Sequence, residues 1–426
     1  MVKFCILPKI YVMSMYKPVN PFFTNTTDIP DEFFCDRKKE TKDIISFIES
    51  GSNIVLKAPR RIGKSSLIKH ILSQPAIKDK YNTLYVDIYG TKNAADFRGE
   101  LQRCFIHAPF AKESKIKKKV ESYLKSLQFD LGSYSESGFN LPKIGIGNYH
   151  APIFSIDEMF ELIEKADKPG LIVFDEFQQI EDYPEKMAGI LRSYIQQMTK
   201  TKFIFCGSSR HMLNNMFFNY NQPFYNSATS FDLDIIGLSA YTDFVTDTFT
   251  VYGKRIDSEA ISFAYYLFSG NTYLMQELMK SVFNYTEEGS EADKQLMLQC
   301  LDKMLERKDS EYRDLINRLN SKKERNTLYC IAGEGIASGL TSTSIMKKYD
   351  LDNASSVQNA LENLCGDSLN IAVKIAKGVY ILRDRLFELW IADRGGYMDL
   401  KLENVKERFE KERKLLLANP EIIAPK

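Results

Sequence analysis

The sequence has few of the features that mark membrane proteins, disulfide-stabilised proteins or proteins that coat nucleic acid. Its seven cysteines are scattered, with no CxxC pair and no cluster with histidine, so we predict neither a zinc site nor a disulfide framework. No apolar run approaches the length of a transmembrane helix, and residues 1–16 lack the apolar core of a signal peptide. The formal net charge is only +1, which argues against binding nucleic acid through bulk charge. We therefore expect a cytoplasmic protein without a membrane segment.

The composition is that of ordinary globular domains. Hydrophobic residues make up 44% of the chain and charged residues 27%, which excludes a disordered chain. A length of 426 residues predicts two or three domains. The first dozen residues are a candidate gene-start artefact, with Met13 or Met15 as the alternative start.

One segment, Ala58-Pro-Arg-Arg-Ile-Gly-Lys-Ser-Ser-Leu67, lies between a predicted strand at 53–57 and a predicted helix at 66–74. Gly-Lys-Ser in this setting is typical of a P-loop, where main-chain N–H groups and the helix N-terminus bind phosphates. Lys64 is then predicted to contact the β- and γ-phosphates, and the Ser65 hydroxyl to bind Mg²⁺. The alternative is a strand–turn–helix in which Gly-Lys-Ser occurs by chance.

The loop departs from the usual pattern at its start. Ala58 stands where a glycine is common, so we expect it to have a negative φ. Pro59 has no N–H, so the phosphate cradle is expected to come from residues 60–65. The predicted nucleotide-binding residues of this loop are Pro59, Arg60, Arg61, Ile62, Gly63, Lys64, Ser65 and Ser66.

A second motif follows at Gly170-Leu-Ile-Val-Phe-Asp-Glu-Phe-Gln178. Its fully apolar run is typical of a central strand in a parallel sheet, and ligands of such sheets bind at the carboxyl ends of the strands. Asp175 is predicted to hold Mg²⁺, and Glu176 to polarise the attacking water. The alternative for an isolated Asp-Glu after a strand is a helix N-cap, but the upstream P-loop favours the catalytic interpretation.

A third apolar strand is predicted at 202–206. If it lies between the P-loop strand and the Asp-Glu strand, Ser208 will lie near the γ-phosphate as a sensor. The alternative is a helix N-cap, a role that Ser209 could fill. Arg192 and Arg210 are the nearest candidates for a charge-stabilising arginine, with little support for either.

Strands that alternate with helices predict an α/β fold, a doubly wound parallel sheet of the P-loop NTPase kind, followed by a helical lid and a winged-helix domain. Within the core we also expect a solvated basic helix at 112–125 and helices at 37–50, with Asp36 as N-cap, and at 183–198. The fifth strand is expected at 231–236. The predicted divisions are an N-terminal extension at 1–19, the core at 20–237 with a β-hairpin insertion at 128–148, the lid at 238–320, the winged helix at 321–394 and a charged helical tail at 395–426.

Several strings together resemble the archaeal-type P-loop ATPases, which are related to the AAA+ and STAND ATPases. They are Asn20-Pro-Phe, Phe34-x-Asp-Arg-x-x-Glu40, the Pro59-Arg-Arg-x-Gly-Lys-Ser-Ser-Leu67 string, Phe174-Asp-Glu-Phe-Gln178, Gly207-Ser-Ser, Pro223-Phe-Tyr225 and Arg385-Leu-Phe-Glu-Leu-Trp390. The resemblance covers nearly all of residues 20–394.

The resemblance implies an ATPase that uses ATP and Mg²⁺. It implies that Lys64 and Ser65 bind nucleotide and metal, that Asp175 binds Mg²⁺ and that Glu176 activates water. It also implies that the turn containing Phe34 packs on the adenine. With Ser208 as the sensor, the candidate catalytic residues are Glu176, Lys64 and Ser208.

The chain also departs from its relatives. Asn226-Ser227 follows Pro223-Phe-Tyr225, where some relatives have an arginine suited to act in trans, and Gly270-Asn-Thr lacks the proline of a related Gly-x-Pro motif. No lid arginine of the AAA+ sensor-2 type is obvious. These departures put rapid hydrolysis and ring assembly in doubt, but not nucleotide binding.

The charge of the predicted winged helix bears on DNA binding. Residues 321–394 contain ten Lys/Arg and nine Asp/Glu, and the expected recognition helix at 355–364 has no Lys or Arg. DNA affinity depends largely on cations that contact phosphates. Lys374 and Lys377 in the predicted wing, with Lys347 and Lys348, could supply a few such contacts. We therefore prefer a protein-contact or lid-sensing role for this domain.

The sequence thus predicts an ATP-binding protein and Mg-dependent ATPase that is slow and acts as a conformational switch. One alternative is an ATP-gated DNA-binding regulator that uses the winged helix. The other is a nucleotide-binding scaffold without significant hydrolysis. The expected partners are ATP and ADP, with a protein or DNA at the winged helix, and an oligomer is possible in principle.

Overall fold

A parallel five-stranded sheet forms the centre of the first half of the chain. The computed structural model describes residues 18–112, 154–366, 368–398 and 400–419. In these ranges the strands are β1 (Ile54–Lys57), β2 (Asn82–Asp87), β3 (Gly170–Asp175), β4 (Lys202–Gly207) and β5 (Thr229–Asp232). Their order is β2-β3-β4-β1-β5, and every neighbouring pair is parallel. The predicted α/β fold class is confirmed.

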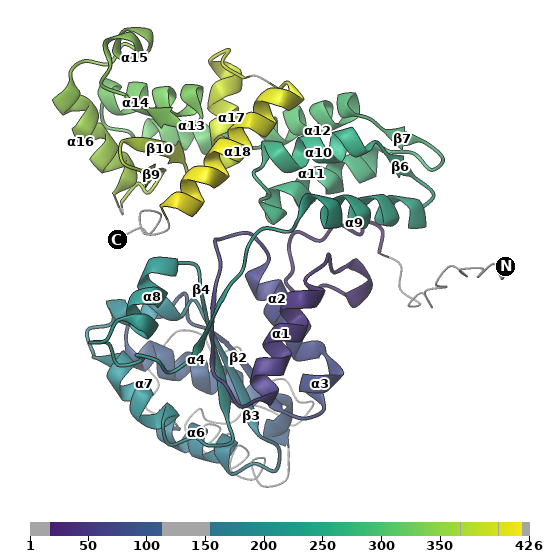
Figure 1. Cartoon of the computed structure of the whole chain (residues 1–426), viewed down its shortest axis with the longest axis vertical. Helices are drawn as coiled ribbons and strands as arrows, with labels where there is room; N and C mark the ends of the chain where they lie inside the picture. The colour runs from purple at the N-terminus through teal and green to yellow at the C-terminus, as the bar shows by residue number, and fades with distance from the viewer. Residues whose placement is uncertain (1–17, 113–153, 367, 399, 420–426) are drawn as a thin grey trace, which may run out of the picture.

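Helices cover both faces of this sheet, as Figure 1 shows. One face carries α1 (Lys38–Glu49), α2 (Lys64–Ser73) and α3 (Pro75–Lys78). The other carries α4 (Ala94–His107), α6 (Ile156–Glu164), α7 (Met187–Ile195) and α8 (Arg210–Phe218). Short 3₁₀ helices are η1 (Asp31–Phe33), η2 (Pro109–Lys112) and η3 (Phe177–Asp182). All six residues of β3 are buried, because helices pack on both sides of it.

Three local predictions for the core are wrong. Asp36 does not cap α1, because both Asp36 and Arg37 have positive φ and Arg37 is the residue that precedes the helix. The helix expected at 183–198 is shorter, since Pro184 cannot donate an N–H and Tyr183 before it is extended. The fifth strand ends at Asp232. The basic helix at 112–125, beyond Lys112, and the hairpin at 128–148 lie outside the described residues.

Hydrogen bonds to Glu164 connect the end of α6 to the turn before β4. Its carboxylate accepts hydrogen bonds from the N–H groups of Thr199, Lys200 and Thr201 at 2.7–3.0 Å and from the Thr201 hydroxyl at 2.8 Å. Partial burial raises the pKa of Glu164, but these hydrogen bonds outweigh that effect and lower its pKa to about 2.

We therefore expect the stabilising effect of Glu164 to depend on pH. A lowered folded-state pKa adds stability above the unfolded value of about 4.5, and this stability is lost as pH falls towards about 2. After allowance for solvent screening of a partly exposed group, Glu164→Gln should cost about 1–2 kcal/mol at neutral pH and little near pH 2.5. Urea unfolding at several pH values checks this, with the exposed neighbour Glu161→Gln as control. A loss that does not shrink in acid would contradict it.

The lid is a helical layer above the sheet. It contains α9 (Leu238–Val251), α10 (Ser258–Leu267), α11 (Thr272–Tyr285) and α12 (Lys294–Arg307), as expected for a helical lid. An unpredicted parallel pair, β6 (Arg255–Ile256) and β7 (Glu291–Ala292), joins its loops. The N-terminal segment packs on this layer: Phe22 lies among Phe249 and Phe283, and Asn20 Nδ2 donates to Lys280 O at 3.0 Å.

The last part of the described chain is a winged helix. Its elements are α13 (Asp309–Asn317), α14 (Lys322–Glu334), β8 (Ala337–Ser338), α15 (Thr343–Lys348), α16 (Ala354–Cys365), β9 (Ala372–Ala376), β10 (Val379–Leu382) and α17 (Arg385–Arg394). The final helix, α18 (Leu402–Ala418), crosses both the lid and the winged helix (Figure 1).

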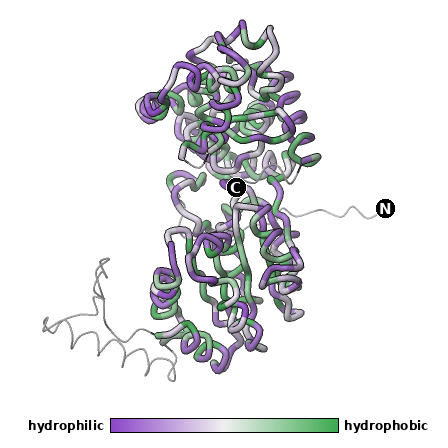
Figure 2. Tube along the Cα trace, turned by 90° about the vertical axis from the view of Figure 1, so that its left-hand side faces the viewer, coloured by the Kyte–Doolittle hydropathy of each residue, from purple (hydrophilic) through white to green (hydrophobic). Residues whose placement is uncertain are grey.

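Figure 2 shows the α/β lobe below the helical lobe, with hydrophobic residues concentrated along the inner strands. None of the helices in the described ranges has the length and apolarity needed to cross a membrane.

Candidate nucleotide-binding site

The loop between β1 and α2 has the backbone of a phosphate cradle. Arg61 and Gly63 have φ values of 66° and 90°, whereas Ala58 has a negative φ, as expected. In the part of the chain that the structure describes, the N–H groups of residues 60–66 have no protein acceptor. These N–H groups surround the N-terminus of α2, where the helix dipole favours an anion. The geometry therefore fits phosphate.

Two polar side chains of the loop face the end of β3. Buried Lys64 forms an ion pair with Asp175, and its Nζ lies 3.4 Å from Glu176 Oε1. The Ser65 hydroxyl donates to Asp175 Oδ2 at 2.7 Å. A hydroxyl and a carboxylate side by side are the hard oxygen ligands that Mg²⁺ prefers beside phosphates, so this donor pair fits the metal.

Glu176 is held in one orientation at the carboxyl end of β3. Its φ of 56° places it in the left-handed region, a strained conformation for a glutamate. Its Oε2 accepts hydrogen bonds from Ser208 Oγ at 2.7 Å and Gln178 Nε2 at 2.6 Å. Burial raises the pKa of Glu176, but the Lys64 charge and these hydrogen bonds lower it below its usual value. Glu176 is therefore ionised and suited to orient a water molecule.

Ser208 reaches Glu176 because β4 lies between β1 and β3, the order on which its predicted position depended. Its hydroxyl also lies 3.4 Å from Arg60 Nε. The N-cap of α8 is its neighbour Ser209, which accepts from Met212 N at 3.4 Å. The N-cap alternative therefore applies to Ser209, and the sensor role of Ser208 stays a prediction.

Sequence reasoning missed two residues that position the carboxylates. The Tyr85 hydroxyl donates to Asp175 Oδ2 at 2.5 Å, and burial raises its pKa, so it remains a donor. The register of β2 and β3 is the feature that places Tyr85 here. Asp87 pairs with Asp175, and Tyr85, two residues before Asp87, lies on the same face of β2 as Asp87. Gln178 ends the second motif, but the sequence predicts no role for it. A Cβ on Gly207 would lie 2.0 Å from Gln178 Oε1, so this packing requires glycine.

Phe34, predicted to contact adenine, stacks on His70 of α2 with ring centroids 4.1 Å apart. His70 Nδ1 lies 2.9 Å from Asp31 Oδ1. Phe34 thus packs on the helix that begins at the cradle, and its contact with adenine stays a prediction.

The two arginines proposed to stabilise charge lie elsewhere. Arg210 donates to Leu233 O at 3.1 Å, at the end of β5. Arg192 lines a surface groove with Tyr220 and Tyr225, apart from the loop. The lid instead contacts Arg61: Tyr273 N donates to Arg61 O at 3.1 Å, and the Arg61 guanidinium lies 5.3 Å from the Tyr273 ring centroid.

The sequence is similar to those of known protein families. A sequence model of ATPase domains predominantly from Archaea matches residues 34–278, and one of a probable winged helix domain matches residues 310–393. An uncharacterized ATP-binding protein of Methanocaldococcus jannaschii is 25% identical over 272 residues, which are 58% of this chain and 71% of that protein.

Two solved structures have the same fold. The Walker-type ATPase of Pyrococcus abyssi has a TM-score of 0.57 and 17% identity, over 87% of this chain and 99% of that one. The ORC2 protein of Aeropyrum pernix has a TM-score of 0.51 and 13% identity, over 93% and 98%. Because the ATPase model spans more than half of the sequence, this chain, with its ATP-binding, ATPase-type domain, belongs to the family of ATPase domains found predominantly in Archaea.

Proposed function

We propose that this protein binds ATP with Mg²⁺, hydrolyses it slowly and uses the nucleotide cycle as a conformational switch. The observation that carries the proposal is the convergence of Lys64, Asp175 and Glu176 beside a cradle of free N–H groups. Ser65 and Asp175 are the residues that would hold Mg²⁺, which supplies charge neutralisation on the phosphates when bound.

The remaining steps belong to the chain's own residues. The N–H groups of the cradle bind the phosphates, and the Lys64 ammonium moves part of its pairing from Asp175 to phosphate oxygens. Glu176 accepts a hydrogen bond from the attacking water and orients it. Ser208 and Gln178 keep the Glu176 carboxylate ionised and fixed in direction. Asn226 and Ser227 stand where some relatives have an arginine suited to act in trans, which supports slow turnover.

A switch needs contacts between the site and the lid, and Arg61 supplies them through Tyr273. A nucleotide that reorders the cradle also changes this contact between Arg61 and Tyr273. The nucleotide then has different affinities for the conformations with and without the contact. The presence of a positioned Glu176 favours this proposal over a scaffold that binds ATP without hydrolysis.

The winged helix is better suited to a protein partner than to DNA. The exposed face of α16 carries no cation in the described residues; it presents Ser355, Gln358, Asn359, Glu362 and Asn363. Without cations, that helix lacks the charged phosphate contacts that supply most of the affinity for DNA.

Lys64→Ala tests the proposal. Loss of one charged phosphate contact should weaken ATP binding about tenfold to a hundredfold, as 1.5–3 kcal/mol is typical of such hydrogen bonds. Titration with a fluorescent ATP analogue in the presence of Mg²⁺ measures the change. Lys80→Ala is the matched control. Lys80 pairs with Glu49 on the surface, and it precedes β2, at the end of the sheet opposite to the phosphate-binding loop. Unchanged affinity in Lys64→Ala would refute nucleotide binding at this loop.

A further inference from the structure

Helix α18 lies outside both matched regions of the sequence, yet it contacts the lid, the winged helix and the segment that follows β5. Phe409 packs against Tyr265 and Tyr266 of α10, with ring centroids 5.6 and 5.3 Å apart. Further along, Leu415 and Leu416 pack on the apolar face of the β9–β10 hairpin. A single helix therefore bridges the lid and the winged helix.

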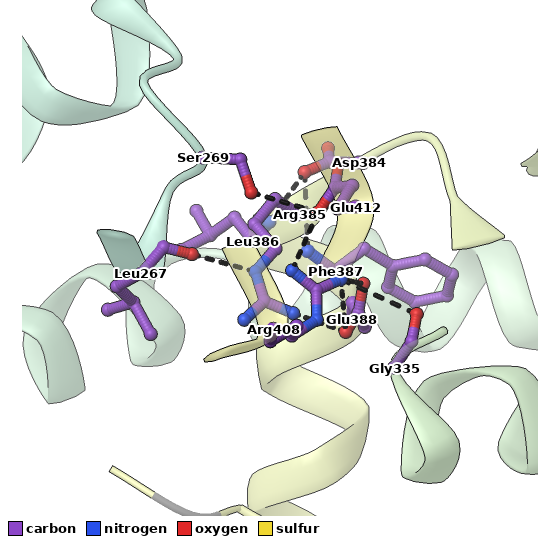
Figure 3. A network of polar contacts seen from close by, with 10 residues as sticks. All are labelled: Leu267, Ser269, Gly335, Asp384, Arg385, Leu386, Phe387, Glu388, Arg408 and Glu412. Carbon is purple, nitrogen blue, oxygen red and sulfur yellow. Dashed lines mark hydrogen bonds and ion pairs between the residues drawn. The ribbon is translucent and has the colours of Figure 1, made fainter. Parts of the chain in front are cut away.

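Charged residues reinforce this bridge, as Figure 3 shows. Arg408 of α18 pairs with buried Glu388 of α17 at 2.9 Å and with Glu412 at 3.0 Å. Glu412 in turn accepts a hydrogen bond from Ser269 Oγ of the lid at 2.9 Å. Arg385 pairs with Glu388 and donates to Leu267 O at 2.8 Å. These contacts join α18 to both the lid and the winged helix, so a movement of α18 affects both.

One residue of α18 reaches the ATPase core. Arg413 contacts the Asp234 carboxylate with both terminal nitrogens, at 3.1 and 2.8 Å. Asp234 lies in residues 233–237, the connector that runs from β5 to α9. The hydrogen bonds from Arg413 lower the pKa of Asp234, so the pair is charged at neutral pH.

The connector is also tied to the phosphate cradle. Arg37, only 3% exposed, donates from Nη2 to Asp234 O at 2.6 Å and to Ile62 O at 3.4 Å. Ile62 precedes Gly63 in the cradle itself. Two arginines therefore link the phosphate-binding loop to α18 through Asp234. Arg37 donates to the main-chain oxygen of Asp234, and Arg413 donates to its carboxylate.

We propose that α18 is a coupling helix that responds to the bound nucleotide through the Arg413–Asp234 contact and passes the change to the winged helix. The inference rests on the proposed nucleotide binding. A nucleotide that shifts Ile62 alters the hold of Arg37 on Asp234, and Arg413 follows the Asp234 carboxylate. Such coupling is reciprocal. Loss of the Arg413–Asp234 contact must therefore change the affinity for nucleotide by the same factor by which nucleotide changes the equilibrium constant of the contact.

Hydrogen exchange of the full chain tests this proposal. In the wild type, peptides from α18 should exchange at different rates in the nucleotide-free protein, with ADP and with a non-hydrolysable ATP analogue. In Arg413→Ala that difference should disappear, and the ratio of ATP-analogue to ADP affinity should change about threefold, the size expected for a partly exposed ion pair. Asp234→Asn should have the same effect, and the double variant should add nothing to either single one.

Arg394→Ala is the matched control, because the Arg394–Asp309 pair also stabilises this lobe but does not reach the core. A merely structural role for Arg413 would raise exchange equally in all three nucleotide states. If the wild type binds nucleotide and α18 exchanges identically in every state, the coupling is refuted while the proposed function stands. If separate titrations show no nucleotide binding, both fail.

Discussion

Replacement of Glu176 by Gln is expected to lower the rate of ATP hydrolysis by about two to four orders of magnitude, the usual contribution of a positioned acid–base group. The amide keeps the shape of the side chain and its contacts with Ser208 and Gln178, but it loses the negative charge that orients water. Affinity for ATP should remain near that of the wild type, because the phosphate cradle and Lys64 are untouched.

Phosphate release under single-turnover conditions measures the hydrolysis step, and a parallel titration measures binding. Glu181→Gln is the matched control: Glu181 lies in η3, the short helix that begins directly after Glu176, and its side chain is exposed. Normal turnover in Glu176→Gln would remove this residue from the mechanism. Loss of binding together with turnover would mean that Glu176 supports the fold of the site instead.

Glu388→Ala is expected to destabilise the helical lobe by about 3–5 kcal/mol, the cost of leaving a buried charge without its partner. The Glu388 side chain is 3% exposed and pairs with both Arg385 and Arg408. Truncation leaves two guanidinium groups together in an interior site. Burial already raises the pKa of Glu388 and lowers that of Arg385 to about 10, which reflects the desolvation cost of this cluster.

Urea unfolding followed by tryptophan fluorescence measures this effect locally, because Trp390 is the only tryptophan and lies in α17 beside the cluster. Glu410→Ala, on the exposed side of α18, is the control and should change stability by about 0.5 kcal/mol or less. A variant with methionine at positions 385, 388 and 408 should recover part of the lost stability, since it removes three buried charges and leaves only Glu412 of this cluster, which keeps its hydrogen bond from Ser269. An unchanged transition in Glu388→Ala would contradict the prediction.

Local patterns were enough to predict the frame of the site. The strand, loop and helix around Lys64 and the apolar strand that ends at Asp175 each have their signal within about fifteen residues. The lid helices and the winged-helix order follow from periodicity in the same way. The position of Ser208 required one more fact, the order of the strands, which the sequence left conditional.

Contacts between distant segments could not be predicted. The Tyr85 contact with Asp175 depends on the register of two neighbouring strands, and no local pattern fixes that register. Arg37 was assigned to a helix start, whereas its left-handed backbone directs the side chain to the connector. The charged tail helix gave no sign that Arg413 meets Asp234, because surface charges at helical spacing are usually solvated.

The contacts around the P-loop also have a consequence for biosynthesis. Arg60 meets Ser208 148 positions later, and Asn20 meets Asn284 264 positions later. A ribosome that adds about 5–20 residues per second takes on the order of 7–30 s to cover those 148 positions. During that interval the emerging loop lacks β4, the strand that flanks β1 in the folded sheet. We therefore expect the proposed nucleotide to protect the nascent chain only after β4 has left the exit tunnel.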